Sequence, residues 1–468
     1  MGSETSPPLT LPKTVVILGV PFHDVTMAET LAHIDEMIAA GRSRYLATAN
    51  LDFAAQASQD VELQRILLEA HLVLCDGTPL IWASRWLKAP IRERVAGSDL
   101  MPELTAHCAK KGYRMFLLGA TDQTLEMASE RMLADHPELV IAGSYAPPIA
   151  KLLDFDNEAI LAKIHAAKPD VLIVCFGCPK QEKWIYMNLP RLDVPVSVGL
   201  GATLDFVAGN FKRAPVWMRK TGLEWVFRLS QEPRRLFNRY WIDLLFFVTG
   251  LRKQRATLEE GRTPAISAAT TSPTTASSPQ NTPALVLKWT GRCDAAQVAA
   301  NTLDSPPADS GSALVLLDLA AVTYLDSTAL GLLLRIYREN KSRGGEFALL
   351  APSTAVTALL VAMKLDRLLP TIASVKDIRT RFDQEQQTSV QSQRELRLAV
   401  EGDIVAGRCP GLQAWAEKAW NGQKTARSLQ LNRQDVNFID SSGLGLLLNL
   451  RRLVETRAKG ELVLLNIN

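Results

Sequence analysis

Asp76 is the residue whose neighbours best suit it to chemistry. It follows the apolar run Leu72–Leu74 in the segment LVLCDGTPLIW, so it is predicted to stand at the end of a strand. A carboxylate held there can act as a general base and take a proton from a substrate hydroxyl. Considered by itself, the same carboxylate is also what an ordinary strand-end turn contains. The choice between the two depends on which residues lie beside it.

Other small polar residues and glycines are predicted at the ends of the neighbouring strands. Parallel α/β sheets bind their ligands outside the carboxyl ends of the strands, where glycine lets a backbone approach a ligand closely. Each of these residues alone is explained by a turn, but the group together predicts a nucleotide or sugar cleft. The group consists of Thr48, Asn50, Asp76, Gly77, Gly119, Gly177, Gly199 and Gly201.

The common cofactor and metal motifs do not occur in the sequence. No G-x-G-x-x-G follows the first predicted strand, and there is no G-x-x-x-x-G-K-[ST]. The D-x-D of Asp154 and Asp156 lies in a helical pattern and is interpreted as a helix start. The C-x-x-C of Cys175 and Cys178 has no second ligand pair with zinc spacing. We therefore expect neither a metal nor another cofactor, and a net charge of +3 is too small to indicate nucleic acid.

The elements that must position these residues alternate between short apolar runs and amphipathic helical patterns. In TMAETLAHIDEMIAAG, Leu31, Ile34 and Ile38 share one helical face, and Thr26 and Glu29 have capping-box spacing. Alternation of this kind predicts βαβ units in an α/β domain with a Rossmann-like, mainly parallel sheet. The predicted strands are TVVILGV, RYLATAN, HLVLCD, YRMFLLGA, LVIAGSY, DVLIVCFG and VPVSVGLGAT.

The composition of the chain changes along its length and predicts further segments. A basic, aromatic and helical appendage follows the α/β domain, and the Ser/Thr/Pro/Ala-rich stretch after it is predicted to be a flexible linker. Two small α/β modules follow, because VTYLDSTALGLLLRIYR and VNFIDSSGLGLLLNLRR repeat one pattern. The predicted segments are a disordered N-terminus at 1–13, the α/β domain at 14–210, the appendage at 211–258, a flexible linker at 259–283, the first module at 284–382, a second linker at 383–394 and a C-terminally truncated second module at 395–468.

The first two folded segments carry motifs in the order of one known family. The motifs TANLDF, LVLCDGTPLIW, RVAGSDLMPEL, FGCPKQEKWI, GLGATLDFVAG and RAPVWMRKTGLEWVFRLSQEPRRLFNRY span about residues 14–250. With them the chain closely resembles the WecG/TagA/CpsF family of bacterial glycosyltransferases. The resemblance implies an inverting, metal-independent enzyme. It would move N-acetylmannosamine, its uronic acid or a related sugar from a UDP-sugar to a polyprenyl-diphosphate-linked acceptor in cell-surface polysaccharide synthesis.

The resemblance also assigns roles in the catalytic centre. Asp76 matches the catalytic base, which takes the proton of the acceptor hydroxyl while that hydroxyl attacks the anomeric carbon. Thr48, placed with Asp76 in the catalytic centre, and Asn50 match the sugar-contacting threonine and asparagine of the family. The strand-end residues Gly177 and Gly201 are expected to line the substrate site.

Two longer side chains are assigned to the nucleotide-sugar. Arg94 matches an arginine near the active site, where a guanidinium would steady the leaving diphosphate. Without its motif, Arg94 would be interpreted as a surface ion pair with Glu93 or Asp99. Gln181, in PKQE, matches a glutamine that meets the nucleotide-sugar.

The appendage combines cations with aromatic side chains. Such a mixture suits an anionic membrane interface, and WIDLLFFVTGL is too short to span a bilayer but able to dip into one. The alternative is a solvated basic helix packed on the domain. The resemblance links the segment to the inner face of the cytoplasmic membrane, so a cytoplasmic, peripheral location is expected. It also assigns Arg228 and Arg235 to completing the site over the diphosphate.

The repeated core D-S-[ST]-[AG]-L-G-L-L-L resembles the STAS module of anti-sigma-factor antagonists and sulfate-transporter tails. In that module a partner kinase phosphorylates a Ser or Thr after the Asp, and here the positions are Thr328 and Ser442. A phosphate there would meet the positive end of a helix. The alternative is that both hydroxyls are only N-caps.

The STAS-like repeats are expected to regulate the enzyme or to dock a protein partner such as a kinase. The alternative function for the whole chain is a partner-switching scaffold whose transferase-like domain is inactive. Apolar helices at the sheet edge also allow a homo-oligomer.

Overall fold

The computed structural model describes most of the chain between residues 12 and 465. The chain forms two compact units, the first of Met1–Ile149, Phe155–Ile185 and Leu189–Ala373, and the second of Ala150–Asp154, Tyr186–Asn188 and Ser374–Asn468. The described residues are 12–211, 214–215, 217–218, 224–231, 233–260, 274–277, 283–300, 303, 306, 314–343, 345–374, 387–392, 395–401, 404, 408–422, 428–436, 439–458 and 461–465.

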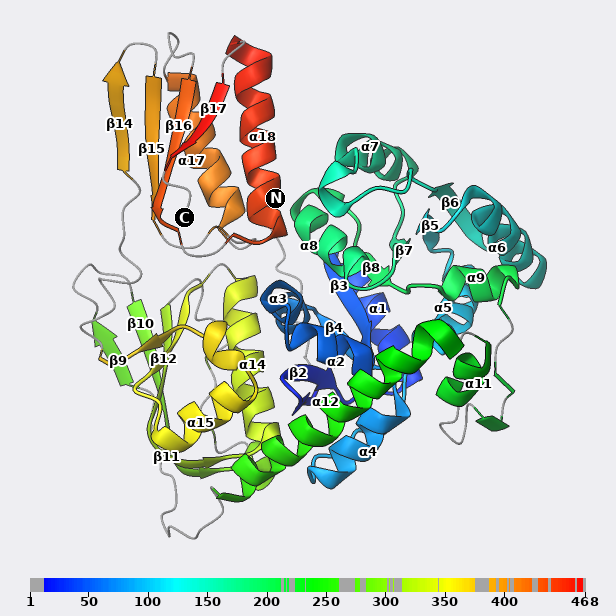
Figure 1. Ribbon diagram of the computed structural model, residues 1–468, viewed down its shortest axis with the longest axis horizontal. Coiled ribbons are helices and arrows are strands. Elements are labelled where there is room, and N and C mark those ends of the chain that lie inside the picture. The colour runs from blue at the N-terminus through cyan, green and yellow to red at the C-terminus, as the bar shows by residue number, and fades with distance from the viewer. Residues whose placement is uncertain are drawn as a thin grey trace. The chain divides into compact units, whose positions relative to one another are not determined.

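A six-stranded sheet forms the centre of the N-terminal domain (Figure 1). Its strands lie in the order β4-β3-β8-β7-β5-β6, and every neighbouring pair is parallel. The near-continuous apolar runs of β4, β7 and β8 are buried, as expected for a sheet covered on both faces. The predicted parallel α/β domain is thereby confirmed. The strands are β3 (Arg44–Ala49), β4 (Leu72–Cys75), β5 (Arg114–Gly119), β6 (Val140–Tyr145), β7 (Val171–Cys175) and β8 (Val196–Gly199).

Two of the helices that connect these strands begin where the sequence predicts a helix start. Thr26 and Glu29 form a complete capping box at the start of the first helix. Asp156 caps another helix by accepting the N–H of Ala159, so the D-x-D is a helix start. The helices are α1 (Met27–Ala40), α2 (Leu51–Ala57), α3 (Val61–Glu69), α4 (Thr78–Trp86), α5 (Gly97–Lys111), α6 (Asp122–Asp135), α7 (Asn157–Ala167), α8 (Lys180–Leu192) and α9 (Thr203–Ala208), with a short 3₁₀ turn η1 (Leu152–Asp154).

The first predicted strand, TVVILGV, folds as a hairpin outside the six-stranded sheet. It divides into β1 (Thr14–Ile17) and β2 (Val20–His23), which pair antiparallel. Leu18 and Gly19 form the turn with φ of 53° and 83°, so both lie in the left-handed region that a tight two-residue hairpin requires. The sequence gives no turn signal before Gly19, because Leu18 continues the apolar run of the predicted strand.

Two helices form the described part of the appendage, α11 (Glu224–Gln231) and α12 (Pro233–Glu260). Leu251, Gln254 and Leu258 in the C-terminal half of α12 are buried, which shows that this half packs on the protein. In the part of the chain that the structure describes, every helix is too short or too polar to cross a membrane.

The two STAS-like repeats each build a small mixed sheet. The first has the strand order β13-β12-β11-β10-β9, and the second has the order β14-β15-β16-β17. The elements of the first are β9 (Thr274–Ser277), β10 (Pro283–Cys293), α13 (Ala295–Ala299), β11 (Leu314–Leu325), α14 (Ser327–Ser342), β12 (Phe347–Leu350), α15 (Thr354–Ala362), η2 (Leu365–Arg367) and β13 (Thr371–Ile372). Those of the second are β14 (Gln387–Ser392), β15 (Glu395–Glu401), α17 (Cys409–Gly422), β16 (Ser428–Asp435), α18 (Ser441–Ala458) and β17 (Glu461–Leu465).

Both predicted linkers contain a strand. β9 falls within 259–283 and pairs antiparallel with β10, and β14 falls within 383–394 and pairs antiparallel with β15. These strands sit at the edge of their sheets, where pairing uses backbone groups and needs no apolar side chains. A polar sequence such as TTAS therefore carries no apolar strand signal, and the linker prediction is corrected at these residues.

The first repeat shares a hydrophobic core with the N-terminal domain. Val16 of β1, Leu68 of α3 and Leu258 of α12 are buried in one cluster with Leu330 and Leu333 of α14. Continuous apolar packing of this kind joins two folding modules into one body. The first repeat is therefore part of the same compact unit as the α/β domain.

Buried polar contacts complete this internal interface. The guanidinium of Arg338 on α14 donates to the carbonyl of Ala70 at 2.9 Å and lies 2.8 Å from His23 Nε2. The other nitrogen of His23 accepts the N–H of Val73 at 2.8 Å. Burial, followed by the charge of Arg338, holds the pKa of His23 well below its usual value, so this histidine stays neutral.

Candidate active site

The predicted site residues gather at the carboxyl ends of four adjacent strands, β4, β3, β8 and β7. The chain winds outward from β3 to β4 and then crosses to the other side of the sheet for β5 to β8. Open α/β sheets bind ligands where the winding direction changes in this way. The residues at these ends are Asp76 after β4, Thr48 and Asn50 at the end of β3, Gly201 after β8, and Gly177 and Gln181 after β7.

Asp76 joins the end of β4 to the start of α4. Its backbone N–H donates to the carbonyl of Ala49 at 2.9 Å, which ties it to the end of β3. Its Oδ2 accepts the N–H of Gly97 at 3.2 Å, and its Oδ1 lies 3.9 Å from Arg94 Nη1. The side chain is 25% exposed, so it is accessible to a substrate.

Arg94 lies among three carboxylates. Its Nη2 binds Asp99 at 2.7 Å, while its Nη1 lies 3.9 Å from Asp76 and 3.7 Å from Glu224. The ion pair with Asp99 is the one expected if Arg94 were only a surface residue. The same guanidinium also faces the candidate base Asp76. Because Glu224 begins α11, the appendage reaches the site. Sequence analysis did not single out Glu224 or Gly97, although both lie within its quoted motifs.

Thr48 and Asn50 are held by the backbone of their own neighbourhood. Thr48 is 6% exposed, and its hydroxyl donates to the carbonyl of Gly199 at 3.2 Å, which links the ends of β3 and β8. Asn50 caps α2 through its Oδ1, which accepts the N–H of Phe53 at 3.2 Å. The Nδ2 group of Asn50 makes no hydrogen bond within the described residues, so it is available to a ligand.

Gln181 braces the loops that follow β7 and β8. Its side chain is 2% exposed, and its Oε1 accepts the N–H groups of Gly177 at 3.1 Å and Gly201 at 2.9 Å. Its Nε2 donates to Glu182 Oε1 at 2.7 Å. The amide oxygen is thus fully used inside the protein, and the contact of Gln181 with a nucleotide-sugar stays a prediction. Glu182 is a further residue that sequence analysis did not identify, although it stands next in the same motif.

Gly177 and Gly201 leave room at the strand ends. Their φ values of 80° and 56° lie in the left-handed region, which favours glycine. A Cβ added to either glycine would meet nothing within 4 Å. Each therefore presents open backbone that a ligand can approach.

The C-x-x-C motif lies beside this site. Cys175 and Cys178 are not joined by a disulfide. Cys175 is buried, and burial raises the pKa of its thiol to about 12, so it stays protonated and unreactive. Among the described side chains, no three His, Cys, Asp or Glu residues gather as metal ligands would.

The remaining predicted residues lie elsewhere in the chain. The side chains of Arg228 and Arg235 fall outside the described residues, although their backbones belong to α11 and α12. Thr328 and Ser442 are 4% and 7% exposed, and neither hydroxyl makes a hydrogen bond within the described residues. Asp326 caps α14 instead, so the alternative that Thr328 is an N-cap is wrong.

Around the first turn of α18 the pattern is the same as around α14. Asp440 Oδ1 accepts the N–H of Gly443 at 2.8 Å, and the Ser442 hydroxyl takes no part. The aspartate before each hydroxyl is the better acceptor, because it carries a full charge near the positive helix end. The N-cap alternative is therefore also wrong for Ser442.

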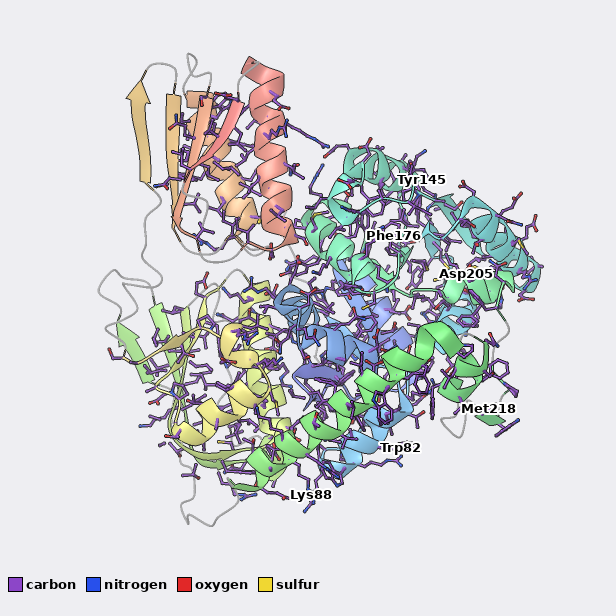
Figure 2. All side chains as sticks on the ribbon, viewed as in Figure 1. Trp82, Lys88, Tyr145, Phe176, Asp205 and Met218 are labelled. Atoms are coloured by element: carbon purple, nitrogen blue, oxygen red, sulfur yellow. The ribbon has the colours of Figure 1, made fainter. Side chains whose placement is uncertain are left out.

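An exposed apolar surface extends over α4 and α12. Trp82 and Trp86 of α4 are 55% and 41% exposed. Figure 2 labels Trp82 beside α4. The Arg255 guanidinium of α12 stacks on the Trp86 ring at 4.4 Å, which places the two helices side by side. We call this surface the α4/α12 face. Its exposed residues are Trp82, Trp86, Phe237, Trp241, Ile242, Leu244, Leu245 and Val248.

Known proteins match both parts of the chain. Residues 15–261 match the glycosyl transferase WecG/TagA/CpsF family, and residues 275–378 and 385–468 match the STAS domain. The N-acetylglucosaminyldiphosphoundecaprenol N-acetyl-beta-D-mannosaminyltransferase of Staphylococcus aureus strain MW2 is 30% identical over 224 residues, which are 47% of this chain and 86% of that protein. The protein of the same name from strain COL shows the same identity and coverage. Among solved structures, the anti-sigma factor antagonist SpoIIAA in its unphosphorylated form is 24% identical with a TM-score of 0.16, over 18% of this chain and 71% of that chain.

Proposed function

This chain belongs to the WecG/TagA/CpsF family of glycosyl transferases, and on that premise we propose that it moves a sugar from a UDP-sugar to a polyprenyl-diphosphate-linked acceptor. The S. aureus relatives are named for transfer of an N-acetylmannosaminyl group to N-acetylglucosaminyldiphosphoundecaprenol. Their names support N-acetylmannosamine or a related sugar as the donor group here. The product would enter a bacterial cell-surface polysaccharide.

The observation that carries this proposal is the pairing of Asp76 with Arg94 at the open strand ends. Asp76 supplies an accessible carboxyl group, and Arg94 supplies a cation 3.9 Å away. Glycosyl transfer from a nucleoside diphosphate needs both, because a proton leaves the acceptor while negative charge develops on the leaving group.

The proposed step inverts the anomeric carbon. The acceptor hydroxyl oxygen bonds to that carbon from the side opposite to UDP, and the bond to the UDP oxygen breaks with its electron pair. Asp76 takes the proton of the hydroxyl. The guanidinium of Arg94 stabilises the charge on the departing diphosphate. Thr48, Asn50, Gly177 and Gly201 would hold the donor sugar and nucleotide against the strand ends.

The α4/α12 face supports a peripheral location at the cytoplasmic membrane. Two of its exposed tryptophans lie on α4, which begins two residues after Asp76. The other apolar side chains of this face lie on α12, which follows α11, and Glu224 of α11 lies 3.7 Å from Arg94. Amphipathic aromatic side chains bind at the headgroup level of a bilayer. A lipid-linked acceptor would reach Asp76 from that surface.

The STAS-like repeats are proposed to regulate the enzyme or dock a protein partner. The alternative is a scaffold without transferase activity. The site favours an active enzyme, because the candidate base is accessible and the Arg94 guanidinium lies 3.9 Å from it.

The test is release of UDP from UDP-N-acetylmannosamine in the presence of N-acetylglucosaminyl-diphosphoundecaprenol. The Asp76→Asn variant keeps the size of the side chain and removes the base. We expect kcat to fall about 100-fold or more, as the loss of a general base does. Asp122→Asn, an exposed change on α6, is the matched control and should turn over like the wild type.

Full turnover by D76N would remove Asp76 from the mechanism. If the wild type releases no UDP with any UDP-sugar and the repeats bind a protein partner, the result would support the scaffold function in place of the transferase function.

A further inference from the structure

The amide of Gln181 has only one favourable orientation. Its Oε1 accepts two N–H groups from two different loops, those of Gly177 and Gly201. An amide rotated by half a turn would point its own NH₂ group at these two donors. An acceptor on the opposite side, which binds the NH₂ group, strengthens the observed orientation. Glu182 Oε1 is that acceptor, 2.7 Å from Gln181 Nε2.

Two hydrogen bonds join Gln181 and Gly177, and each residue donates one of them. The Gln181 backbone N–H donates to the carbonyl of Gly177 at 3.0 Å, while the Gly177 N–H donates to the Gln181 side chain at 3.1 Å. The first turn of α8 therefore fixes the turn after β7. Through Gly201 the same side chain fixes the turn after β8.

Glu182 is wholly buried against the end of β8. Its exposure is 0%, and its Oε2 makes no hydrogen bond within the described residues. A Cβ added to Gly199 would lie 2.8 Å from both Glu182 Oε1 and Gln181 Nε2, so the pair rests directly on the strand backbone. A buried carboxyl group with an unpaired oxygen destabilises a fold, so its presence indicates a role at the site.

We propose that Glu182 is a positioning residue for the donor site. Its carboxyl group fixes the Gln181 amide, and that amide holds the turns of Gly177 and Gly201 in the form that admits the nucleotide-sugar. This inference rests on the proposed function. It concerns the shape of the site and not the chemical step, because Glu182 is buried and does not reach the reacting atoms.

The ionisation of Glu182 supports this role. Burial raises the pKa of Glu182 to about 7, while hydrogen bonds from Gln181, the backbone and Cys178 act in the opposite direction. The titratable groups that face it are Tyr45 of β3 and Cys178 of the loop before α8. A carboxylate binds the Gln181 amide more strongly than a carboxylic acid does. Donor affinity should therefore rise as the pH increases through about 7.

Two variants of Glu182 test the proposal. Glu182→Met keeps the approximate size but has no oxygen acceptor, and Glu182→Gln keeps an acceptor oxygen without the charge. For E182M we expect the donor KM to rise about tenfold or more with a smaller change in kcat, because a hydrogen bond to a charged group is lost. E182Q should recover most of that loss and should show no step in donor KM near pH 7. Glu126→Met and Glu126→Gln, at an exposed position on α6, are the controls.

Amide hydrogen exchange gives a readout that does not depend on activity. The Gly177 and Gly201 N–H groups both donate to Gln181, so their exchange should be faster in E182M and close to wild type in E182Q. Unchanged exchange and unchanged donor KM in folded E182M would overturn the proposal. An inactive wild type would instead overturn the proposed function, and the exchange measurement would still decide the role of Glu182.

Discussion

Arg94 is the cation that the candidate site shares among three carboxylates. Asp76, Asp99 and Glu224 all lie within 3.9 Å of its guanidinium, so the described cluster carries excess negative charge. A diphosphate would be repelled by two of these charges unless further cations approach it. The sequence supplies such cations in the same appendage helices that deliver Glu224.

Replacing Arg94 tests this arrangement at the scale of one residue. Arg94→Lys keeps the charge but loses the planar fork that binds Asp99 through Nη2 and faces Asp76 through Nη1. We expect kcat/KM for UDP release to fall about 100-fold, as when one preorganised donor is removed from an active site. Arg42→Lys, on the exposed end of the α1–β3 loop, should change nothing. Wild-type kinetics in R94K would show that the guanidinium does not meet the leaving group.

At the scale of elements, α12 joins the exposed α4/α12 face to the interior. Its residue Gln254 is 3% exposed, accepts the N–H of Leu18 at 2.9 Å and donates to the carbonyl of Val16 at 2.9 Å. The same amide lies 3.4 Å from the hydroxyl of Ser327 at the start of α14. One helix is therefore anchored to the β1–β2 hairpin and to the first repeat. Its other half carries the exposed apolar residues of the α4/α12 face.

Removing apolar area from the α4/α12 face should weaken membrane binding without harming the site. Trp241 and Ile242 are 56% and 59% exposed, so Trp241→Ser with Ile242→Ser should leave the fold intact. We expect binding to vesicles of anionic phospholipid to fall about tenfold or more, as each lost side chain is worth about 1.5–3 kcal/mol when buried. UDP release with a water-soluble acceptor analogue should not change. Leu133→Ser, 39% exposed on α6, is the control, and equal vesicle binding in both variants would exclude this face.

At the scale of the whole molecule, the two repeats use the same helix differently. In α14 of the first repeat, Leu330 and Leu334 are 0% exposed because α14 lies against the β1–β2 hairpin. Their counterparts in α18 of the second repeat, Leu444 and Leu448, are 37% and 41% exposed. Helix α14 of the first repeat is therefore buried against the N-terminal domain. The proposed regulatory or docking role is therefore assigned to α18 of the second repeat, where the corresponding leucines are accessible.

Two corresponding glycines show the difference in packing between α14 and α18. A Cβ added to Gly331 would lie 2.1 Å from the carbonyl oxygen of Thr14, whereas at Gly445 it would meet nothing closer than 3.4 Å. A backbone carbonyl cannot move aside as a side chain can. We expect Gly331→Ala to lower the free energy of unfolding by about 1–3 kcal/mol, the usual cost of overpacking. The matched Gly445→Ala should be close to neutral, and calorimetric melting of both variants measures the difference.

Local patterns in the sequence determined the parallel α/β class, the two repeats and the order of the family motifs. Apolar runs and capping signals consist of residues that are close together in the sequence, so β3 to β8 and α1 were predictable. Asp76, Thr48 and Asn50 were predictable because a strand end and a contiguous motif mark each of them. The pairing of Arg94 with Asp99 was also predictable, since it joins residues five positions apart.

Tertiary contacts decided what no local pattern contains. Glu224 meets Arg94 across a long sequence separation, and Glu182 acquires its role only because β8 buries it. The edge strands β9 and β14 form through backbone pairing, which places no demand on side chains. The attachment of the first repeat depends on Gly331 and Arg338 meeting the β1–β2 hairpin, more than 300 positions away in the chain. The sequence by itself therefore determined which groups can do chemistry, and the tertiary structure decided which of them meet.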